Sequence, residues 1–209
     1  MPKSFWRIPQ IWDGDTCFII GGGPSLKYFD IERIRGKGRI IAVNCAYGLG
    51  NWFDAMFYGD FHWLRQYGIG LTKFGGLKAT AGVDRLADKW VNALDIKVTQ
   101  KDFTTAGLSK NPDVLNWNQS SGACAINLAT LLGAGKIILL GFDMQRIGGR
   151  ANYHDNYDPH APAFDAFYIF IPPFTAIAAD LREMNIECLN ASPGSALKAF
   201  PIIDPERIC

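Results

Sequence analysis

The 209-residue sequence predicts an α/β fold in which helices cover both faces of an open, mostly parallel sheet. Short apolar runs alternate with helical or loop segments, and three of these runs indicate fully buried strands: residues 17–22, 39–44 and 136–142. Strands that follow one another through helical crossovers pair in parallel. The chain contains no repeat, low-complexity tract or linker, so we expect one domain over residues 1–209.

Four shorter strands complete the predicted sheet. Each is a run of apolar or alternating residues that ends at a polar or turn-forming residue. They are expected at residues 55–58, 77–80, 96–99 and 186–189. The second of them lies inside the glycine-rich stretch 68–82, which is otherwise predicted as loop.

Four helices are predicted from their start and stop signals. They are expected at residues 26–35, 61–67, 123–132 and 174–184. Ser25 can cap the first helix, which is short and irregular, and Asp60 can cap the second. Gly133 ends the third helix, and Pro173 opens the last one.

Two polar segments are predicted as long loops. Residues 104–119 are polar and contain Asn-Pro, which indicates a surface loop, and residues 146–162 are polar with interspersed aromatic side chains. Long loops in compact domains are often functional. We therefore expect both segments to act as lids over a site.

Composition and charge exclude several classes of protein. A formal net charge of +1, from 21 Lys and Arg against 20 Asp and Glu, leaves no broad surface for nucleic acid or an anionic membrane. No apolar run is long enough to span a membrane, and residues 1–10 lack the apolar core of a secretory signal. The five cysteines are scattered and form no Cys-x-x-Cys pair, which argues against a disulfide scaffold or zinc site. We expect a cytoplasmic protein.

The most informative motif is the turn Gly21-Gly22-Gly23-Pro24-Ser25, between the first strand and the first helix. Glycines allow a tight turn that brings backbone N–H groups close to a ligand, and a helix N-terminus favours phosphate. This is the context of the first turn of a Rossmann-like nucleotide-binding domain. The pattern is neither G-x-G-x-x-G nor a P-loop, so a tight turn without a ligand stays open.

Polar residues also end other strands at the same edge of the sheet. Asn44 can bind a base or ribose or form a turn, and Asp60 can contact a ribose or metal or cap a helix. Ser121 and Gly122 open a helix where they can bind an anion or simply cap it. Asp143 follows the strand 136–142. Ligands of open α/β sheets bind outside the carboxyl ends of the strands, so we expect these residues around one crevice.

The loop 146–162 carries the best candidates for acid–base chemistry. A histidine near a crevice can act as a general base at neutral pH, and tyrosines can donate hydrogen bonds to a phosphate. The candidates are Tyr153, His154, Tyr157 and His160. A metal site with no familiar ligand spacing and an ordinary solvated loop are the alternatives.

Taken in order, the blocks of the sequence resemble one superfamily. These blocks are CFIIGGGPSLKYFD, RIIAVN, AMFYGD, SSGACAINLATLLGAGKIILLGFDM and IECLNASPGSALKAF. They resemble the bacterial sialyltransferases of glycosyltransferase family 42, the related 6-hydroxymethylpterin diphosphokinase-like proteins, and short forms found in phages and prophages. The resemblance covers most of the chain except roughly residues 68–118.

The resemblance implies roles for individual residues. In the sialyltransferases, the glycine-rich turn and the Asn after the second strand bind the nucleotide of CMP-sialic acid, which implies residues 21–25 and Asn44 here. The serine and glycine that open the later helix contact the donor, which implies Ser121 and Gly122. Family tyrosines bind the departing phosphate and a loop histidine acts as base. By residue type and region, these roles imply Tyr153, Tyr157, His154 and His160.

Three functions follow as hypotheses. The first is a metal-independent transferase that moves a sugar from a CMP- or UDP-sugar donor to a hydroxyl of a small molecule or glycan, with His154 or His160 as base. The second is a diphosphokinase-like enzyme with Asp60 and Asp143 binding Mg²⁺. The third is a nucleotide-binding module without catalysis, such as a phage accessory protein. Magnesium dependence separates the first two, and turnover separates both from the third.

Overall fold

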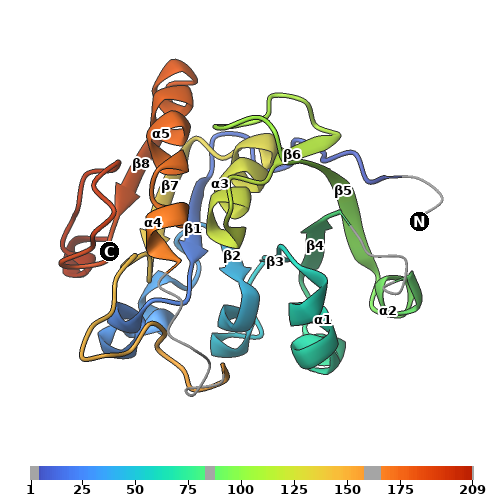
Figure 1. The fold of residues 1–209 in the computed structure, drawn as a ribbon, viewed down its shortest axis with the longest axis horizontal. Helices are drawn as coiled ribbons and strands as arrows, with labels where there is room; N and C mark the ends of the chain where they lie inside the picture. The colour runs from blue at the N-terminus through green and yellow to red at the C-terminus, as the bar shows by residue number, and fades with distance from the viewer. Residues whose placement is uncertain (1–4, 83–87, 158–165, 209) are drawn as a thin grey trace.

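A computed structural model describes residues 5–82, 88–157 and 166–208. These residues form one eight-stranded sheet whose pairings are all parallel, in the order β6-β5-β4-β3-β2-β1-β7-β8 (Figure 1). The strands are β1 (Thr16–Ile20), β2 (Arg39–Val43), β3 (Ala55–Tyr58), β4 (Leu77–Ala81), β5 (Ile96–Asp102), β6 (Val114–Asn116), β7 (Lys136–Leu140) and β8 (Glu187–Asn190). The predicted α/β fold with an open parallel sheet is confirmed, as are its seven predicted strands.

The order of the strands creates a switch point beside β1. From β1 the chain adds strands in one direction out to β6, and then returns to add β7 and β8 on the other side of β1. Connections therefore leave the carboxyl ends of β1 and β7 in opposite directions. Such a point opens a crevice at the carboxyl edge of an α/β sheet.

Two apolar layers cover the sheet because successive side chains of a strand point to opposite faces. On β1, Cys17 and Ile19 pack in the layer that includes α3 (Ser121–Leu132) and α5 (Pro173–Glu183). Phe18 and Ile20 pack in the opposite layer. That layer contains α1 (Phe61–Tyr67), α2 (Asp88–Ala93) and the short 3-10 segments (Figure 1).

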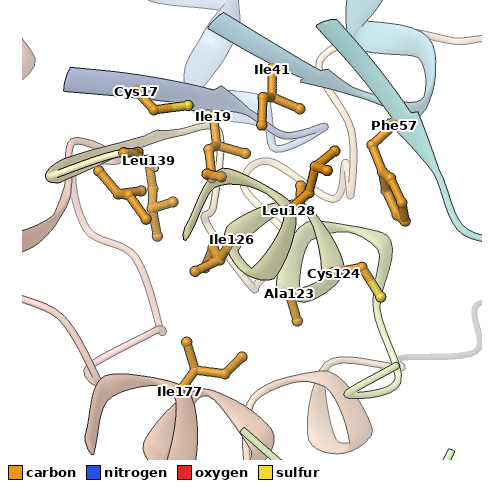
Figure 2. Packing of buried hydrophobic residues seen from close by; sticks show 14 of the residues in the cluster. Cys17, Ile19, Ile41, Phe57, Ala123, Cys124, Ile126, Leu128, Leu139 and Ile177 are labelled. Carbon is orange, nitrogen blue, oxygen red and sulfur yellow. The ribbon is translucent and has the colours of Figure 1, made fainter. Parts of the chain in front are cut away.

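The α3 helix lies at the centre of the first layer. Nine of its 12 residues are buried, as expected of a helix that is apolar or small on all sides. Figure 2 shows Leu128 pointing toward the strands and Ile126 between the sheet and Ile177 of α5. Gly133, with a φ of 104°, ends the helix in the left-handed conformation that the predicted glycine C-cap requires.

The helix predicted over residues 26–35 is wrong in detail. The chain forms two 3-10 segments, η1 (Pro24–Tyr28) and η2 (Ile31–Ile34), with extended backbone at Phe29 and Asp30 between them. The Asp30 side chain accepts a hydrogen bond from Glu32 N at 3.1 Å and so starts a new helical turn. The aspartate cap therefore interrupts the helix that the apolar spacing suggests.

The surface loop predicted over residues 104–119 is wrong in part, because only residues 104–113 and 117–119 are without helix or strand. Residues Val114–Asn116 form β6, and Leu108, Leu115 and Asn118 are buried. Buried Asn127 of α3 holds the segment, because its amide bonds the N–H and C=O of Ser109 and the N–H of Asn116. A polar stretch is buried here because a side-chain amide satisfies its backbone groups.

Several short elements were not predicted. They are η3 (Asn44–Leu49), η4 (Gly68–Lys73), α2, β6, α4 (Phe167–Phe170) and η6 (Pro205–Arg207). Their lengths of three to six residues give too little periodicity to recognise. In the parts of the chain that are described, no helix is long and apolar enough to cross a membrane.

Candidate functional site

A cavity of about 500 Å³ opens at the carboxyl edge of the sheet, over the switch point between β1 and β7. Cavities of this size accommodate small-molecule ligands. Its walls come from the ends of β1, β2, β3 and β7, from the start of α3, and from the loop after β7. The predicted site residues that line it are Gly21, Gly22, Gly23, Asn44, Asp60, Ser121, Gly122, His154 and Tyr157.

The glycine-rich turn is held by hydrogen bonds to the end of β7. Gly21 N–H donates to Leu140 O and Gly23 N–H to Gly141 O, both at 2.8 Å. Ser25 N–H donates to Asp143 Oδ2 at 3.3 Å, and Pro24 has no N–H to offer. Only the Gly22 N–H of this turn has no partner among the described residues. The turn therefore contributes one free amide to the cavity rather than a cradle of amides.

Asp143 lies behind this turn and does not line the cavity. Its side chain is 1% exposed and accepts from both the N–H and the hydroxyl of Ser25. Burial raises the pKa of the carboxyl, although the bonds from Ser25 oppose that shift. Its other oxygen, Oδ1, has no hydrogen-bond partner in the described part of the chain. Asp143 thus fixes the conformation of the turn from within the protein.

Asn44 and Asp60 line the cavity at the ends of β2 and β3. Asn44 adopts a left-handed φ of 52°, and its buried Oδ1 has no hydrogen-bond partner among the described residues. The Asp60 Oδ1 accepts from Trp63 N at 2.8 Å and caps α1, as predicted. Asn44 therefore has an amide oxygen available for a ligand. In Asp60, one carboxylate oxygen caps α1 and the second oxygen takes no part in that cap.

The N-terminus of α3 faces the same cavity. Ser120 is the cap, because its Oγ accepts from Ala123 N at 3.1 Å. The N–H groups of Ser121 and Gly122, in the first turn, have no partner among the described residues. The start of a helix carries partial positive charge, so this end suits an anionic ligand.

The loop after β7, residues 144–157 (the site loop), is docked onto the glycine turn and η3. Tyr153 N–H donates to Gly22 O at 2.9 Å, and the Tyr153 hydroxyl donates to Cys45 O at 3.3 Å. The Cys45 thiol donates to the Tyr157 hydroxyl at 3.8 Å. Burial strongly raises the pKa of Tyr157, so this phenol remains protonated and can donate a hydrogen bond.

His154 reaches the cavity from the site loop, between the rings of Tyr153 and Tyr157 at centroid distances of 4.6 and 4.9 Å. Burial lowers the pKa of the imidazole below its usual 6.5, so the ring is neutral at pH 7. Its Nδ1 accepts from Asn156 N at 3.2 Å, which places the proton of the neutral ring on Nε2. Tyr153 itself does not line the cavity, and His160 lies outside the described residues.

Strained backbone gathers around the cavity. Six described residues other than glycine have positive φ: Asn44, Asp95, Asn118, Gln119, Met144 and Asn185. Three of them, Asn44, Gln119 and Met144, line the cavity. Such conformations cost free energy and are concentrated at functional sites, which supports a ligand-binding role for this cavity.

Sequence reasoning missed several residues of the cavity. Trp117, Phe142, Phe167 and Phe170 form an aromatic wall, and Arg146 and Asn152 extend from the site loop. The Lys101 ammonium lies 4.0 Å from the centre of the Trp117 ring and donates to Gly59 O. These residues come from segments that only tertiary contacts bring together. The Gly148-Gly149 pair was a signal for a turn that would carry its neighbours to the site.

No family model matches the chain, and no curated protein matches it. Among solved structures, the chain is similar to the sialyltransferase CstII from Campylobacter jejuni in complex with cytidine-5′-monophosphate. The TM-score is 0.56 at 16% identity, over 91% of this chain and 85% of that chain. A second CstII structure, in complex with CMP-3FNeuAc, gives a TM-score of 0.54 at 16% identity, over 90% of this chain and 86% of that one. The likeness establishes a shared fold.

Proposed function

We propose that this protein is a glycosyltransferase that binds a nucleotide-sugar donor in the cavity and transfers the sugar to a hydroxyl group of an acceptor. The observation that carries the proposal is the convergence of Gly22, Asn44 and the start of α3 at the switch point of this sheet. The shared fold with CstII, whose structures contain CMP and CMP-3FNeuAc, adds support. A CMP- or UDP-sugar is the donor class we propose.

Free hydrogen-bonding groups suit a nucleotide in this cavity. Asn44 Oδ1 can accept from an amino or hydroxyl group, and the N–H groups of Ser121 and Gly122 can donate to phosphate oxygens. Tyr157, held as a neutral phenol, can donate to the phosphate as charge develops on it. The aromatic wall offers apolar surface for a sugar or a base.

The proposed reaction is a single displacement at the donor sugar. The acceptor oxygen bonds to the anomeric carbon while the bond from that carbon to the phosphate oxygen breaks. The nucleotide leaves with that electron pair, and the acceptor proton passes to His154. In the present arrangement the Nδ1 lone pair of His154 faces Asn156 N–H. We therefore expect the ring to release that contact when an acceptor binds.

The arrangement of carboxylates favours this reaction over magnesium-dependent phosphoryl transfer. Asp60 follows β3, whereas Asp143 follows β7 and is buried against Ser25. The two carboxylates do not converge, and the described residues contain no group of three or more His, Cys, Asp or Glu suited to a metal ion. Bound Mg²⁺ in phosphoryl transfer needs carboxylates beside the phosphates.

Ligand-dependent stabilisation tests the proposal. We would measure the melting temperature with CMP, CDP, UDP, GDP, ATP and CMP-sialic acid, each with and without Mg²⁺. A ligand that binds only the native state raises the melting temperature. We expect a metal-independent rise with a cytidine or uridine nucleotide, followed by release of that nucleotide when a sugar donor meets an acceptor. A rise only with ATP and Mg²⁺, or binding without turnover, would contradict it.

A further inference from the structure

The cavity needs a source of positive charge that the glycine turn does not provide. Three of the four N–H groups in that turn are used within the protein, as described above. Among the described residues that line the cavity, Arg146 alone has a permanent positive charge. The other titratable side chains there include the Cys45 thiol, the Asp60 carboxyl and the His154 imidazole, which burial keeps neutral at pH 7. Tyr157 is an uncharged phenol.

A tight turn in the site loop sets the position of Arg146. Ile147 and Arg150 exchange backbone hydrogen bonds of 2.9 and 3.1 Å across Gly148 and Gly149, whose φ values are 57° and 79°. Two positive φ angles are typical of the tight hairpin turn that Gly-Gly permits. The Arg146 guanidinium donates to Gly149 O at 3.0 Å, which tethers one end of the group to this turn.

The Arg146 guanidinium has donors to spare. In the described part of the chain, no ion pair joins it to a carboxylate, whereas Arg150 on the other side of the turn pairs with Asp155. A guanidinium has five N–H donors, and one carbonyl bond leaves most of them free. Arg146 is exposed at the cavity rim, so a ligand can reach it.

Asn152 brings a second side chain to the same place. It lines the cavity, and its Oδ1 lies 3.0 Å from where a Cβ of Gly22 would be. Gly22 therefore leaves room for the Asn152 amide directly above the turn. No hydrogen bond engages this amide among the described residues, so its NH₂ group is available to an oxygen of a ligand.

We propose that Arg146 and Asn152 bind the phosphate of the nucleotide, in a site completed by the Gly22 N–H. This inference rests on the function proposed above and specifies how its donor is oriented. Arg146 belongs to the loop after β7 and Gly22 to the turn after β1, whereas Asp60 follows β3, on the far side of β2. The anionic end of the ligand therefore lies at β7, and its neutral, hydroxyl-bearing end lies toward Asp60.

Calorimetric titration with CMP and with cytidine tests the inference, because the two ligands differ only in the phosphate. For Arg146→Gln we expect CMP affinity to fall about ten- to a hundredfold, with cytidine affinity unchanged. The CMP affinity of this variant should also depend less on salt. Asn152→Asp should weaken CMP binding similarly by repelling the phosphate. Arg150→Gln, which removes the same charge from the same turn, is the matched control and should leave CMP affinity within about twofold.

Each outcome decides between the two proposals. If wild-type protein prefers CMP to cytidine but Arg146→Gln keeps that preference, the assignment of Arg146 is wrong while the proposed function stands. If the variant loses affinity for CMP-sialic acid and not for CMP, Arg146 contacts the sugar carboxylate, which overturns the phosphate assignment. If wild-type protein binds no nucleotide of the panel, the proposed function fails and this inference fails with it.

Discussion

Ser25 and Asp143 join the first and last turns of the site from within the protein. The Ser25 hydroxyl donates to Asp143 Oδ2 at 2.9 Å across 118 residues of sequence. This bond fastens the glycine turn after β1 to the end of β7, on either side of the switch point. The shape of the cavity floor therefore depends on a buried carboxylate that does not itself line the cavity.

Asp143 predicts a dependence of stability on pH. Burial raises the pKa of the Asp143 carboxyl in the folded protein above its ordinary value of 3.8. Between pH 3.8 and the raised pKa, the carboxyl is therefore protonated in the folded state and ionised in the unfolded state. Its contribution to stability therefore falls as pH rises from about 3.8 through the raised pKa. We expect Asp143→Asn, which keeps an oxygen for Ser25, to lack that loss when melting temperature is measured against pH.

Asp143→Ala separates the hydrogen bonds from the charge. It leaves the Ser25 N–H and hydroxyl without their partner, so we expect a loss of about 1–3 kcal/mol in the free energy of unfolding at all pH values. Equal melting curves for the Asn variant and wild type across the whole pH range would contradict a shifted carboxyl.

Gly22 and Gly23 predict opposite phenotypes for the same substitution. A Cβ at Gly22 would lie 3.0 Å from Asn152 Oδ1, at the end of a side chain that can move. Gly22→Ala should therefore lower CMP affinity about three- to tenfold with little change in stability. A Cβ at Gly23 would meet Gly141 O at 2.6 Å and overlap the Asp143 side chain, so Gly23→Ala should destabilise the fold.

A double-mutant cycle checks the reason for the Gly22 effect. If displacement of Asn152 causes the loss, Gly22→Ala should cost no further affinity in an Asn152→Ala background. Additive losses from the two substitutions would show that Gly22 acts independently of Asn152.

The sequence predicted the sheet because its strands are buried on both faces and so leave continuous apolar runs, as at 136–142. The predicted strands also located the strand ends. Gly22, Asn44 and Asp60, which follow three of these ends, do lie around one cavity. Burial of β6 could not be predicted, because it depends on the Asn127 amide of a distant helix. Local composition describes Val114–Asn116 only as part of a polar stretch.

Side chains from loops escaped prediction for a related reason. Arg146 and Asn152 reach the cavity because Tyr153 N–H bonds Gly22 O and a tight turn folds the loop back. Neither contact leaves a periodic signal. Conversely, Asp143 was expected at the crevice because it ends a strand, yet the packing of Ser25 places it behind the turn. Strand ends indicate which residues are near a site, but not which way their side chains point.

His154 predicts a pH profile for sugar transfer. Its pKa lies below 6.5 because of burial, so the rate should rise with pH below that value and reach a plateau by pH 7. His154→Ala should lower the transfer rate about 10²- to 10⁴-fold while leaving CMP affinity unchanged. His62→Ala, an exposed histidine outside the cavity, is the control and should keep the wild-type rate. A full rate in His154→Ala, with a loss in His160→Ala, would assign the base to His160.

We expect the Asn127 amide to stabilise the part of the fold that supports the site. Its Oδ1 accepts from Ser109 N at 3.0 Å and from Asn116 N at 3.2 Å, and its Nδ2 donates to Ser109 O at 2.9 Å. Asn127→Leu would leave these three backbone groups without a partner in a buried position. We therefore expect the free energy of unfolding, measured with urea, to fall by about 2–4 kcal/mol. Asn111→Ala removes one exposed amide contact, to Asp113 N, and should cost about 0.5 kcal/mol. Equal losses in the two variants would mean that the Asn127 amide does not hold β6 against the sheet.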